Sequence, residues 1–164
     1  METPPPAERH IVVLTTEPLP VTGGVTTGAG LRAWGLAAGL VARGFRVTLA
    51  SPAGPETPVP AQAGDPAAQR VARRDIGRFL ATTKPDVVVL QHWGLAAEVP
   101  DVDVPLVIDL AGPHLLERAY WGSDNPARDL AEKLDALRRA DFVTCSGEYQ
   151  RHYFLPFLMQ AGHD

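Results

Sequence analysis

Residues 11–15 read IVVLT, residues 47–50 read VTLA, and between them the stretch LRAWGLAAGLVARG at 31–44 repeats apolar residues every three or four positions. Two short apolar runs rich in β-branched residues, separated by an amphipathic stretch, are typical of a strand–helix–strand unit. Both runs are nearly continuously apolar, which is the pattern of strands covered on both faces. These residues therefore predict parallel strands joined by a right-handed helical crossover.

The helix predicted between these two strands has recognisable ends. Thr26 or Thr27 supplies a hydroxyl that can cap its first turn, and Gly44 stands where a left-handed residue commonly ends a helix. Its apolar positions fall at i, i+3, i+4, i+7 and i+8, so they form one face. These positions are Ala33, Leu36, Ala37, Leu40 and Val41.

The same alternation continues along the chain. Apolar runs at 87–90, 106–110 and 142–145 predict three further strands, and a helix is predicted over about 66–81. Doubly wound folds often place another strand after the second one. The stretch 51–64 is instead rich in Pro, Gly and Ala, so we interpret it as a loop.

Two more helices are predicted near the end of the sequence. One begins at Asn125, an N-cap residue that is followed by a proline at the favoured first helical position. The other follows Ser146, which is a good N-cap residue. Pro156 lies inside that last helix, and because an interior proline costs about 3 kcal/mol we expect the helix to kink or break there.

Together these elements predict an α/β fold, a Rossmann-like three-layer sandwich with a central parallel sheet. At 164 residues the chain has the length of one ordinary domain. We expect that domain to span residues 10–164, after a flexible Pro-rich tail at residues 1–9.

Composition narrows the classes of function. The net charge of −4 argues against a nucleic-acid partner. The single cysteine, Cys145, excludes an internal disulfide and fits a reducing cytoplasm. Neither a signal peptide nor an apolar run of about 20 residues is visible, so a cytoplasmic protein is expected. The strong preference for Arg over Lys suggests a GC-rich bacterial genome.

The predicted topology points to one edge of the sheet. In an open parallel sheet, ligands bind beyond the carboxyl ends of the strands, where the strand order reverses. With the usual order, this point lies between the loops that follow strands 11–15 and 87–90. The first loop contains Gly23 and Gly24, and the second contains His92 and Trp93. We therefore expect the binding site at these two loops.

The glycine pair has two interpretations. Gly23 and Gly24 can let a phosphate or sugar approach backbone N–H groups near a helix N-terminus, or they can form a turn that needs positive φ. A dinucleotide site is disfavoured, because Gly24, Gly28 and Gly30 do not form G-x-G-x-x-G. Ser51 also stands where such a site has an acidic residue that holds the ribose.

Three residues after strand ends are candidates for contact with a ligand. His92 can donate to a sugar hydroxyl or exchange a proton near neutral pH, or it can make only a structural hydrogen bond. Trp93, beside it, would face the same crevice. Asp109 can accept hydrogen bonds from hydroxyls of an acceptor, or it can cap the short helix that follows it.

Other chemistries find less support. His114 and Glu117 can share a helix face, but one such pair is more often a surface hydrogen bond than a metal site, and no zinc-type pairing of histidines is visible. Ser146 resembles a nucleophile elbow, yet Thr144 and Glu148 replace both glycines of G-x-S-x-G. No metal and no cofactor is therefore expected.

Four arginines of the predicted helix 66–81 recur at i, i+3, i+4 and i+8. They are Arg70, Arg73, Arg74 and Arg78. Such a stripe is by default a solvated face. The sharper hypothesis is peripheral contact with an anionic membrane, to which each cation near the surface adds about 1 kcal/mol.

Five segments, in order, resemble the amino-terminal domain of glycosyltransferase family 4, a large retaining family with the two-domain GT-B fold. The segments are IVVLTTEPLP (11–20) before the glycine pair, LAAGLVARGFRVTLASP (36–52), PDVVVLQHW (85–93), VPLVIDLAGPHLLE (104–117) and ADFVTCSGEYQRHYF (140–154).

The resemblance implies that the chain binds the acceptor, a glycan or a lipid-linked glycan, while a second domain binds most of the nucleotide-sugar donor. It places Gly23 and Gly24 in the loop that faces the donor phosphates, and it places Asp109 and His114 beside the acceptor crevice. The family frequently has a histidine where this chain has Ala111 and Gly112, so His114 is slightly displaced from that position.

The donor half of such an enzyme is missing from the sequence. The two glutamates of the family's donor motif, separated by seven residues, have no counterpart among the eight glutamates present. We therefore expect the chain to be inactive by itself, its donor domain either truncated or carried on a separate chain. The alternative is a noncatalytic Rossmann-like binding or interaction module, since fold does not fix function.

Overall fold

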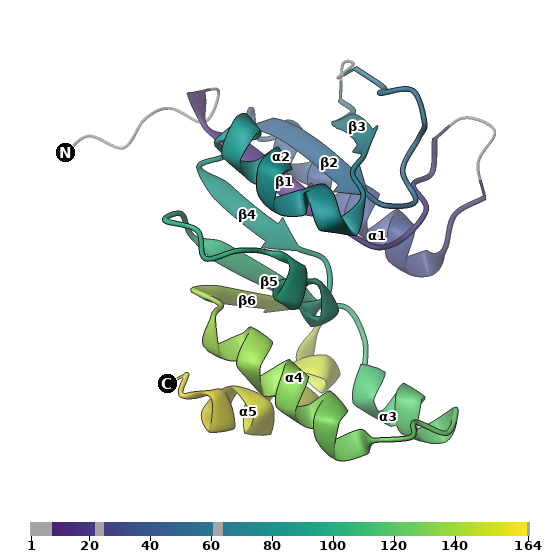
Figure 1. Ribbon diagram of the computed structural model, residues 1–164, viewed down its shortest axis with the longest axis vertical. Coiled ribbons are helices and arrows are strands. Elements are labelled where there is room, and N and C mark those ends of the chain that lie inside the picture. The colour runs from purple at the N-terminus through teal and green to yellow at the C-terminus, as the bar shows by residue number, and fades with distance from the viewer. Residues whose placement is uncertain (1–7, 22–24, 61–63, 164) are drawn as a thin grey trace.

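The computed structural model describes residues 8–21, 25–60 and 64–163 (Figure 1). Within these residues, six strands form one parallel sheet in the order β3-β2-β1-β4-β5-β6. The strands are β1 (His10–Leu14), β2 (Arg46–Ser51), β3 (Ala67–Arg70), β4 (Val87–Leu90), β5 (Leu106–Leu110) and β6 (Phe142–Cys145). The predicted parallel sheet of an α/β fold is confirmed, with the first strand between the second and the VVVL strand.

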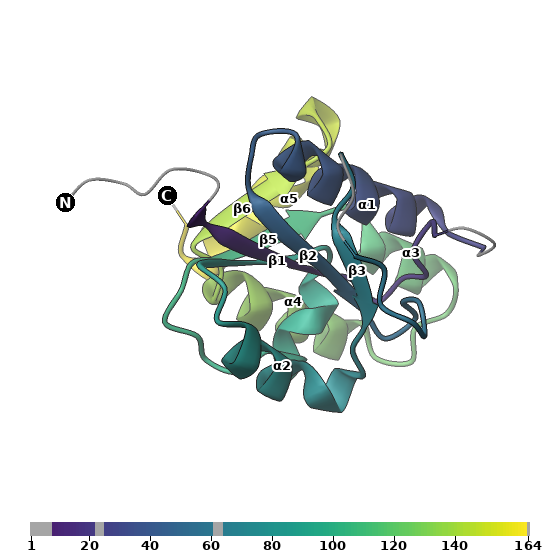
Figure 2. The ribbon, with the colours of Figure 1, turned by 90° about the horizontal axis from the view of Figure 1, so that it is seen from above.

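Helices cover both faces of this sheet, so the molecule has three layers, as predicted (Figure 2). The helix α1 packs on one face, while α2 and α4 pack on the other, and α5 packs against α4. The helices are α1 (Gly28–Val41), α2 (Ile76–Thr83), α3 (His114–Tyr120), α4 (Pro126–Arg138) and α5 (Glu148–Ala161). Short 3₁₀ helices lie at Arg73–Asp75 and Trp93–Glu98.

The first helix follows its sequence pattern. The Thr27 hydroxyl accepts a hydrogen bond of 3.0 Å from the Gly30 N–H, so Thr27 is the N-cap. Gly44 has a φ of 87°, as expected of the residue that turns the chain after a helix. A Cβ on Gly30 would overlap the Pro18 carbonyl oxygen. A residue without a side chain therefore lets α1 lie directly against the loop after β1.

The prediction for residues 51–81 was wrong in two respects. Residues Ala67–Arg70 form strand β3 rather than the start of a helix, and α2 begins only at Ile76. Ala and Gln are helix-forming residues, but the free edge of β2 pairs with this segment. Val59 forms an antiparallel bridge with Ala68, which adds two backbone hydrogen bonds. Tertiary pairing therefore overrides the local preference.

The last helix also differs from its prediction. Its N-cap is Gly147, with a φ of 102°, rather than Ser146, whose hydroxyl contacts Arg32. The helix continues through Pro156 instead of breaking there. Proline removes one backbone donor to the carbonyl of His152, and because His152 and Pro156 are both exposed, water can take the place of that donor.

The start of α4 confirms its prediction. The Asn125 side chain accepts a hydrogen bond of 3.0 Å from the Arg128 N–H, and Pro126 occupies the first helical position. Two charged residues of this helix are unexpectedly buried, Asp129 and Lys133. Across residues 8–21, 25–60 and 64–163, no helix combines the length and the apolar character that crossing a bilayer requires.

Candidate functional site

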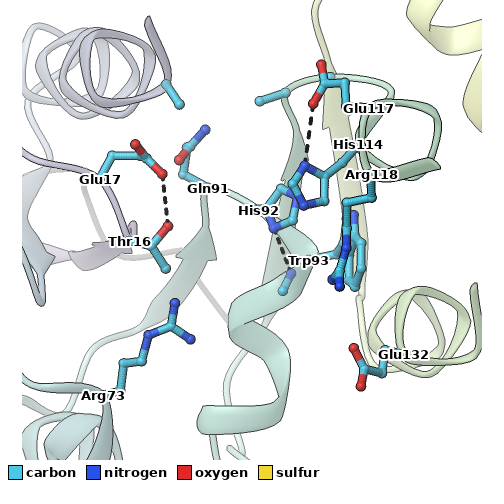
Figure 3. A pocket seen from close by; sticks show the side chains of 14 residues that line it. Thr16, Glu17, Arg73, Gln91, His92, Trp93, His114, Glu117, Arg118 and Glu132 are labelled. Carbon is cyan, nitrogen blue, oxygen red and sulfur yellow. Dashed lines mark hydrogen bonds and ion pairs between the residues drawn. The ribbon is translucent and has the colours of Figure 1, made fainter. Parts of the chain in front are cut away.

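A cavity of about 450 Å³ opens at the carboxyl edge of the sheet, where the strand order reverses between β1 and β4. Thr16 and Glu17, which follow β1, line one side (Figure 3). Gln91 and His92, which follow β4, lie between this side and the residues of α3. The position is the one that the predicted topology assigns to a binding site.

Three of the predicted site residues come together in the cavity wall. The ring centroids of His92 and His114 are 4.5 Å apart, with the two rings nearly perpendicular. Trp93 lies 4.9 Å from His92 and 5.9 Å from His114 by the same measure. Because Trp93 is only 4% exposed, its ring supports the two imidazoles rather than offering an open surface. Their contact with a ligand stays a prediction.

His92 is held in an unusual backbone conformation. Its φ of 152° is rare for a residue with a side chain and costs on the order of 1–3 kcal/mol. The imidazole Nδ1 accepts a hydrogen bond of 2.9 Å from the Gly94 N–H, which starts the short helix at Trp93–Glu98. The predicted structural hydrogen bond is therefore present. Strain of this kind is concentrated at functional sites, so a further role for the ring is favoured.

The protonation state of His92 follows from its surroundings. Burial, with smaller contributions from the charges of His114 and Lys133, lowers the pKa of His92 to about 4. The ring is therefore neutral at pH 7, and because Nδ1 accepts, its proton resides on Nε2. That Nε2 atom is buried and has no hydrogen-bond partner among the described residues. His92 is thus a hydrogen-bond donor rather than a base at neutral pH.

His114 has a carboxylate neighbour. Its Nδ1 atom lies 3.5 Å from Oε2 of Glu117, one helical turn further along α3. The pair that the sequence suggested does share a helix face, and both residues line the cavity. A carboxylate beside one ring nitrogen orients an imidazole. Of the two histidines, His114 is the one that has such a carboxylate beside it.

Glu17 is the cavity residue that the sequence did not suggest. Its carboxylate accepts a hydrogen bond of 2.8 Å from the Thr27 hydroxyl and one of 3.1 Å from the Thr16 hydroxyl. It therefore lies beside the N-cap of α1, close to the helix terminus where an anion was predicted. The signal in the sequence was its position just after the first strand.

The predicted phosphate loop contains Gly23, Gly24, Thr26 and Thr27. Gly23 and Gly24 lie outside the described residues, and the two threonines make internal contacts. The Thr26 hydroxyl donates 2.7 Å to the Pro18 carbonyl oxygen, and Thr27 is occupied as the N-cap that also contacts Glu17.

Asp109 does not line the cavity. Its carboxylate is 1% exposed and accepts two hydrogen bonds from Arg32, of 2.6 and 2.7 Å. The Thr144 hydroxyl donates a third bond of 2.7 Å. The N-cap residue of α3 is Pro113, and no side chain caps this helix, so Asp109 does not cap it either. Asp109 instead joins α1 to the last two strands of the sheet.

The predicted basic stripe is not a single helical face. Arg70 belongs to β3, Arg73 and Arg74 to the 3₁₀ helix, and Arg78 to α2. Each of the four guanidinium groups lies within 4.0 Å of a carboxylate, for example Arg70 at 3.3 Å from Glu56. Peripheral membrane contact stays a prediction. The helical stripe of arginines on which it was based is not formed by these four residues.

The fold and the cavity define a class of protein: a Rossmann-like α/β domain with a ligand-sized cavity at its topological switch point. No protein-family model matches the chain, and no curated protein matches it either.

Proposed function

We propose that this chain is the acceptor-binding domain of a glycosyltransferase, one half of a GT-B enzyme that transfers a sugar from a nucleotide-sugar to a glycan or lipid-linked acceptor. The five ordered segments suggest the family. The observation that carries the proposal is the cavity at the switch point, where the two predicted histidines pack together and His114 lies beside the Glu117 carboxylate. A donor domain, supplied elsewhere, would close over this edge of the sheet.

The cavity offers the hydrogen-bonding groups that a sugar requires. A hydroxyl both donates and accepts, so it is best bound where acceptors and donors alternate. The carboxylates of Glu17 and Glu117 accept, and the Gln91 amide, whose oxygen is taken by the Thr15 hydroxyl, donates. The volume of about 450 Å³ lies within the range of small-molecule sites.

The same geometry suggests roles in transfer. A sugar acceptor must lose a proton from its attacking hydroxyl, and a base near neutral pH does this best. His114, oriented by Glu117, is our candidate for that base. His92, neutral at pH 7, would pack against the His114 ring and help to fix its position.

Binding of the nucleotide-sugar donor would depend on the other domain. A helix N-terminus contributes only about 0.3–1 kcal/mol toward an anion, while micromolar binding needs about 8 kcal/mol. Glu17 beside the α1 N-cap weakens this contribution further. We therefore expect the domain alone to bind an acceptor sugar without catalysing transfer.

The test is an NMR titration of the histidine ring resonances. Methyl glycosides of glucose, mannose, galactose and N-acetylglucosamine would be added in turn, with UDP and NAD⁺ as nucleotide probes. We expect at least one glycoside to shift the His92 and His114 resonances to saturation, while those of His152, exposed on α5, stay in place.

Two outcomes contradict the proposal. If NAD⁺ or UDP shifts these resonances and no glycoside does, the site is a nucleotide site. If none of the probes shifts them, the noncatalytic interaction module is the better account. A His114→Asn variant tests whether the glycoside binds at this site, since it should weaken glycoside binding while leaving the fold unchanged.

A further inference from the structure

The charges around the cavity are unevenly distributed. Three carboxylates line it, those of Glu17, Glu117 and Glu132. The two guanidinium groups in the lining are each paired with a carboxylate outside it: Arg73 with Glu98, and Arg118 with Asp129 at 3.0 Å. Both guanidinium groups among the described lining residues are thus neutralised. The cavity wall therefore carries an excess of negative charge.

Glu17 is the carboxylate with the firmest position. Its backbone carbonyl accepts a hydrogen bond of 2.6 Å from the Ser51 hydroxyl, and its N–H donates 3.2 Å to the Thr15 hydroxyl. The side chain is held by Thr16 and Thr27, which are neutral. Glu132 pairs with Arg128 and Glu117 lies beside the His114 imidazole, whereas Glu17 makes no ion pair within the described residues. Its full negative charge therefore acts on whatever enters the cavity.

A buried donor faces the same space. Gln91 lines the cavity although only 2% of it is exposed. Its Oε1 atom accepts a hydrogen bond of 2.8 Å from the Thr15 hydroxyl, which leaves its amide N–H groups without a partner in the described part of the chain. The cavity therefore combines a fixed donor with an unneutralised acceptor.

We propose that this cavity selects an uncharged polyhydroxyl ring and rejects its phosphate ester, and that Glu17 is the residue that sets this specificity. A hydroxyl can accept a hydrogen bond from the Gln91 amide and donate one to the Glu17 carboxylate. A phosphate ester carries a charge of about −1.5 to −2 at pH 7, so the Glu17 carboxylate repels it. The inference rests on the proposed function, because it takes the cavity as the place where the acceptor sugar binds.

The experiment compares matched pairs of ligands. Glucose, mannose, galactose and N-acetylglucosamine would each be titrated against the corresponding 6-phosphate, with inorganic phosphate as a further probe, using the His114 ring resonances as the readout. We expect any sugar that binds to do so roughly ten-fold more tightly than its 6-phosphate, because one like charge at close range is worth about that factor. The preference should diminish as salt is raised.

Two variants isolate the cause. Glu17→Gln keeps an oxygen for the Thr27 hydroxyl but removes the charge, so the preference should fall to about three-fold or less. Glu56→Gln is the control, because Glu56 pairs with Arg70 at 3.3 Å outside the cavity lining and its change should leave the preference nearly unchanged. Thermal unfolding of both variants checks that the fold is retained.

The outcomes separate this inference from the proposed function. If a sugar and its 6-phosphate bind equally, or if Glu17→Gln leaves the preference unchanged, the specificity is wrong while the sugar site stands. If inorganic phosphate alone shifts the His114 resonances, the specificity is also wrong. If no sugar binds in any form, both the sugar site and its specificity are overturned.

Discussion

Two buried charged groups of this protein are stabilised in opposite ways. Asp109, 1% exposed, receives two hydrogen bonds from Arg32 and one from Thr144. Lys133, fully buried in α4, has no hydrogen-bond partner for its Nζ atom among the described residues. The first group is neutralised by pairing. The second is surrounded by hydrocarbon.

Aromatic rings of α5 take the place of a counter-ion for Lys133. Its Nζ atom lies 3.6 Å from the ring centroid of Phe157, 4.6 Å from that of Phe154 and 5.1 Å from that of Tyr153. Burial nevertheless lowers the pKa of Lys133 to about 8. Cation–π attraction of about 0.5–2 kcal/mol per ring offsets only part of the lost hydration.

The comparison teaches that burial of a charge says nothing by itself about stability. A bidentate guanidinium satisfies the carboxylate that it meets, so the Asp109 network holds α1 against β5 and β6. The ammonium of Lys133 is tolerated without such a partner, and its charge contributes to the lowered pKa of His92. Three substitutions test this contrast, taken from the largest expected effect to the smallest.

Arg32→Met should have the largest effect. It leaves the Asp109 carboxylate buried with one neutral donor, and removing one member of a buried pair costs about 3 kcal/mol of unfolding free energy. Urea denaturation should show a lower midpoint with an unchanged slope. Thr144→Val, which removes one hydrogen bond, is the matched comparison and should cost about 1 kcal/mol. A loss below about 0.5 kcal/mol for Arg32→Met would mean that the pair is not the main support of Asp109.

Lys133→Met should instead stabilise the protein, by about 2 kcal/mol at pH 7, since the lowered pKa corresponds to about 3 kcal/mol before the rings are considered. Between pH 8 and pH 10.5 the unfolded chain holds a proton on Lys133 that the folded chain has released. Wild-type stability should therefore rise with pH across this window, and the advantage of the variant should shrink. Equal or lower stability of Lys133→Met at pH 7 would argue against an uncompensated charge.

Phe157→Leu should have the smallest effect. It removes the ring nearest to the ammonium, so the charged form of Lys133 loses support and the pKa of Lys133 should fall further. The measurement is a pH titration of the lysine side-chain resonances by NMR. The chain contains one other lysine, Lys84, whose resonance should be the same in both proteins. An unchanged or higher pKa in the variant would show that Phe157 contributes no attraction.

Much of the fold could be predicted from the sequence, because periodic apolar residues mark the helices and strands that form the core. The ends of β1 and β2 lie within one residue of their predicted positions. Strand β3 could not be predicted, since its residues AAQR carry helix-forming side chains and become a strand only beside β2. The stability of an edge strand depends on its neighbour rather than on its own composition.

The site was predictable where it depends on strand ends and not where it depends on loops. His92 and Trp93 follow β4 directly, so topology alone placed them at the right edge. Glu17 also follows a strand, but its side chain was not singled out, because its orientation depends on a hydrogen bond from Thr27 across the intervening loop. The burial of Lys133 was not predicted for a different reason. The helical pattern identifies apolar residues as the buried face, and it gives no indication that a charged residue is buried with them.

The central strand has a consequence for how this protein is made. Thr15 and Gln91, which bond to each other at the ends of β1 and β4, are 76 residues apart. A ribosome adding 5–20 residues per second needs about 4–15 s to cover that interval. During this interval the residues IVVL of β1 lack β4, the second of their two neighbouring strands. An apolar strand with an unpaired edge is prone to pair with other chains. Nascent chains of this protein should therefore depend on chaperones most strongly before β4 emerges.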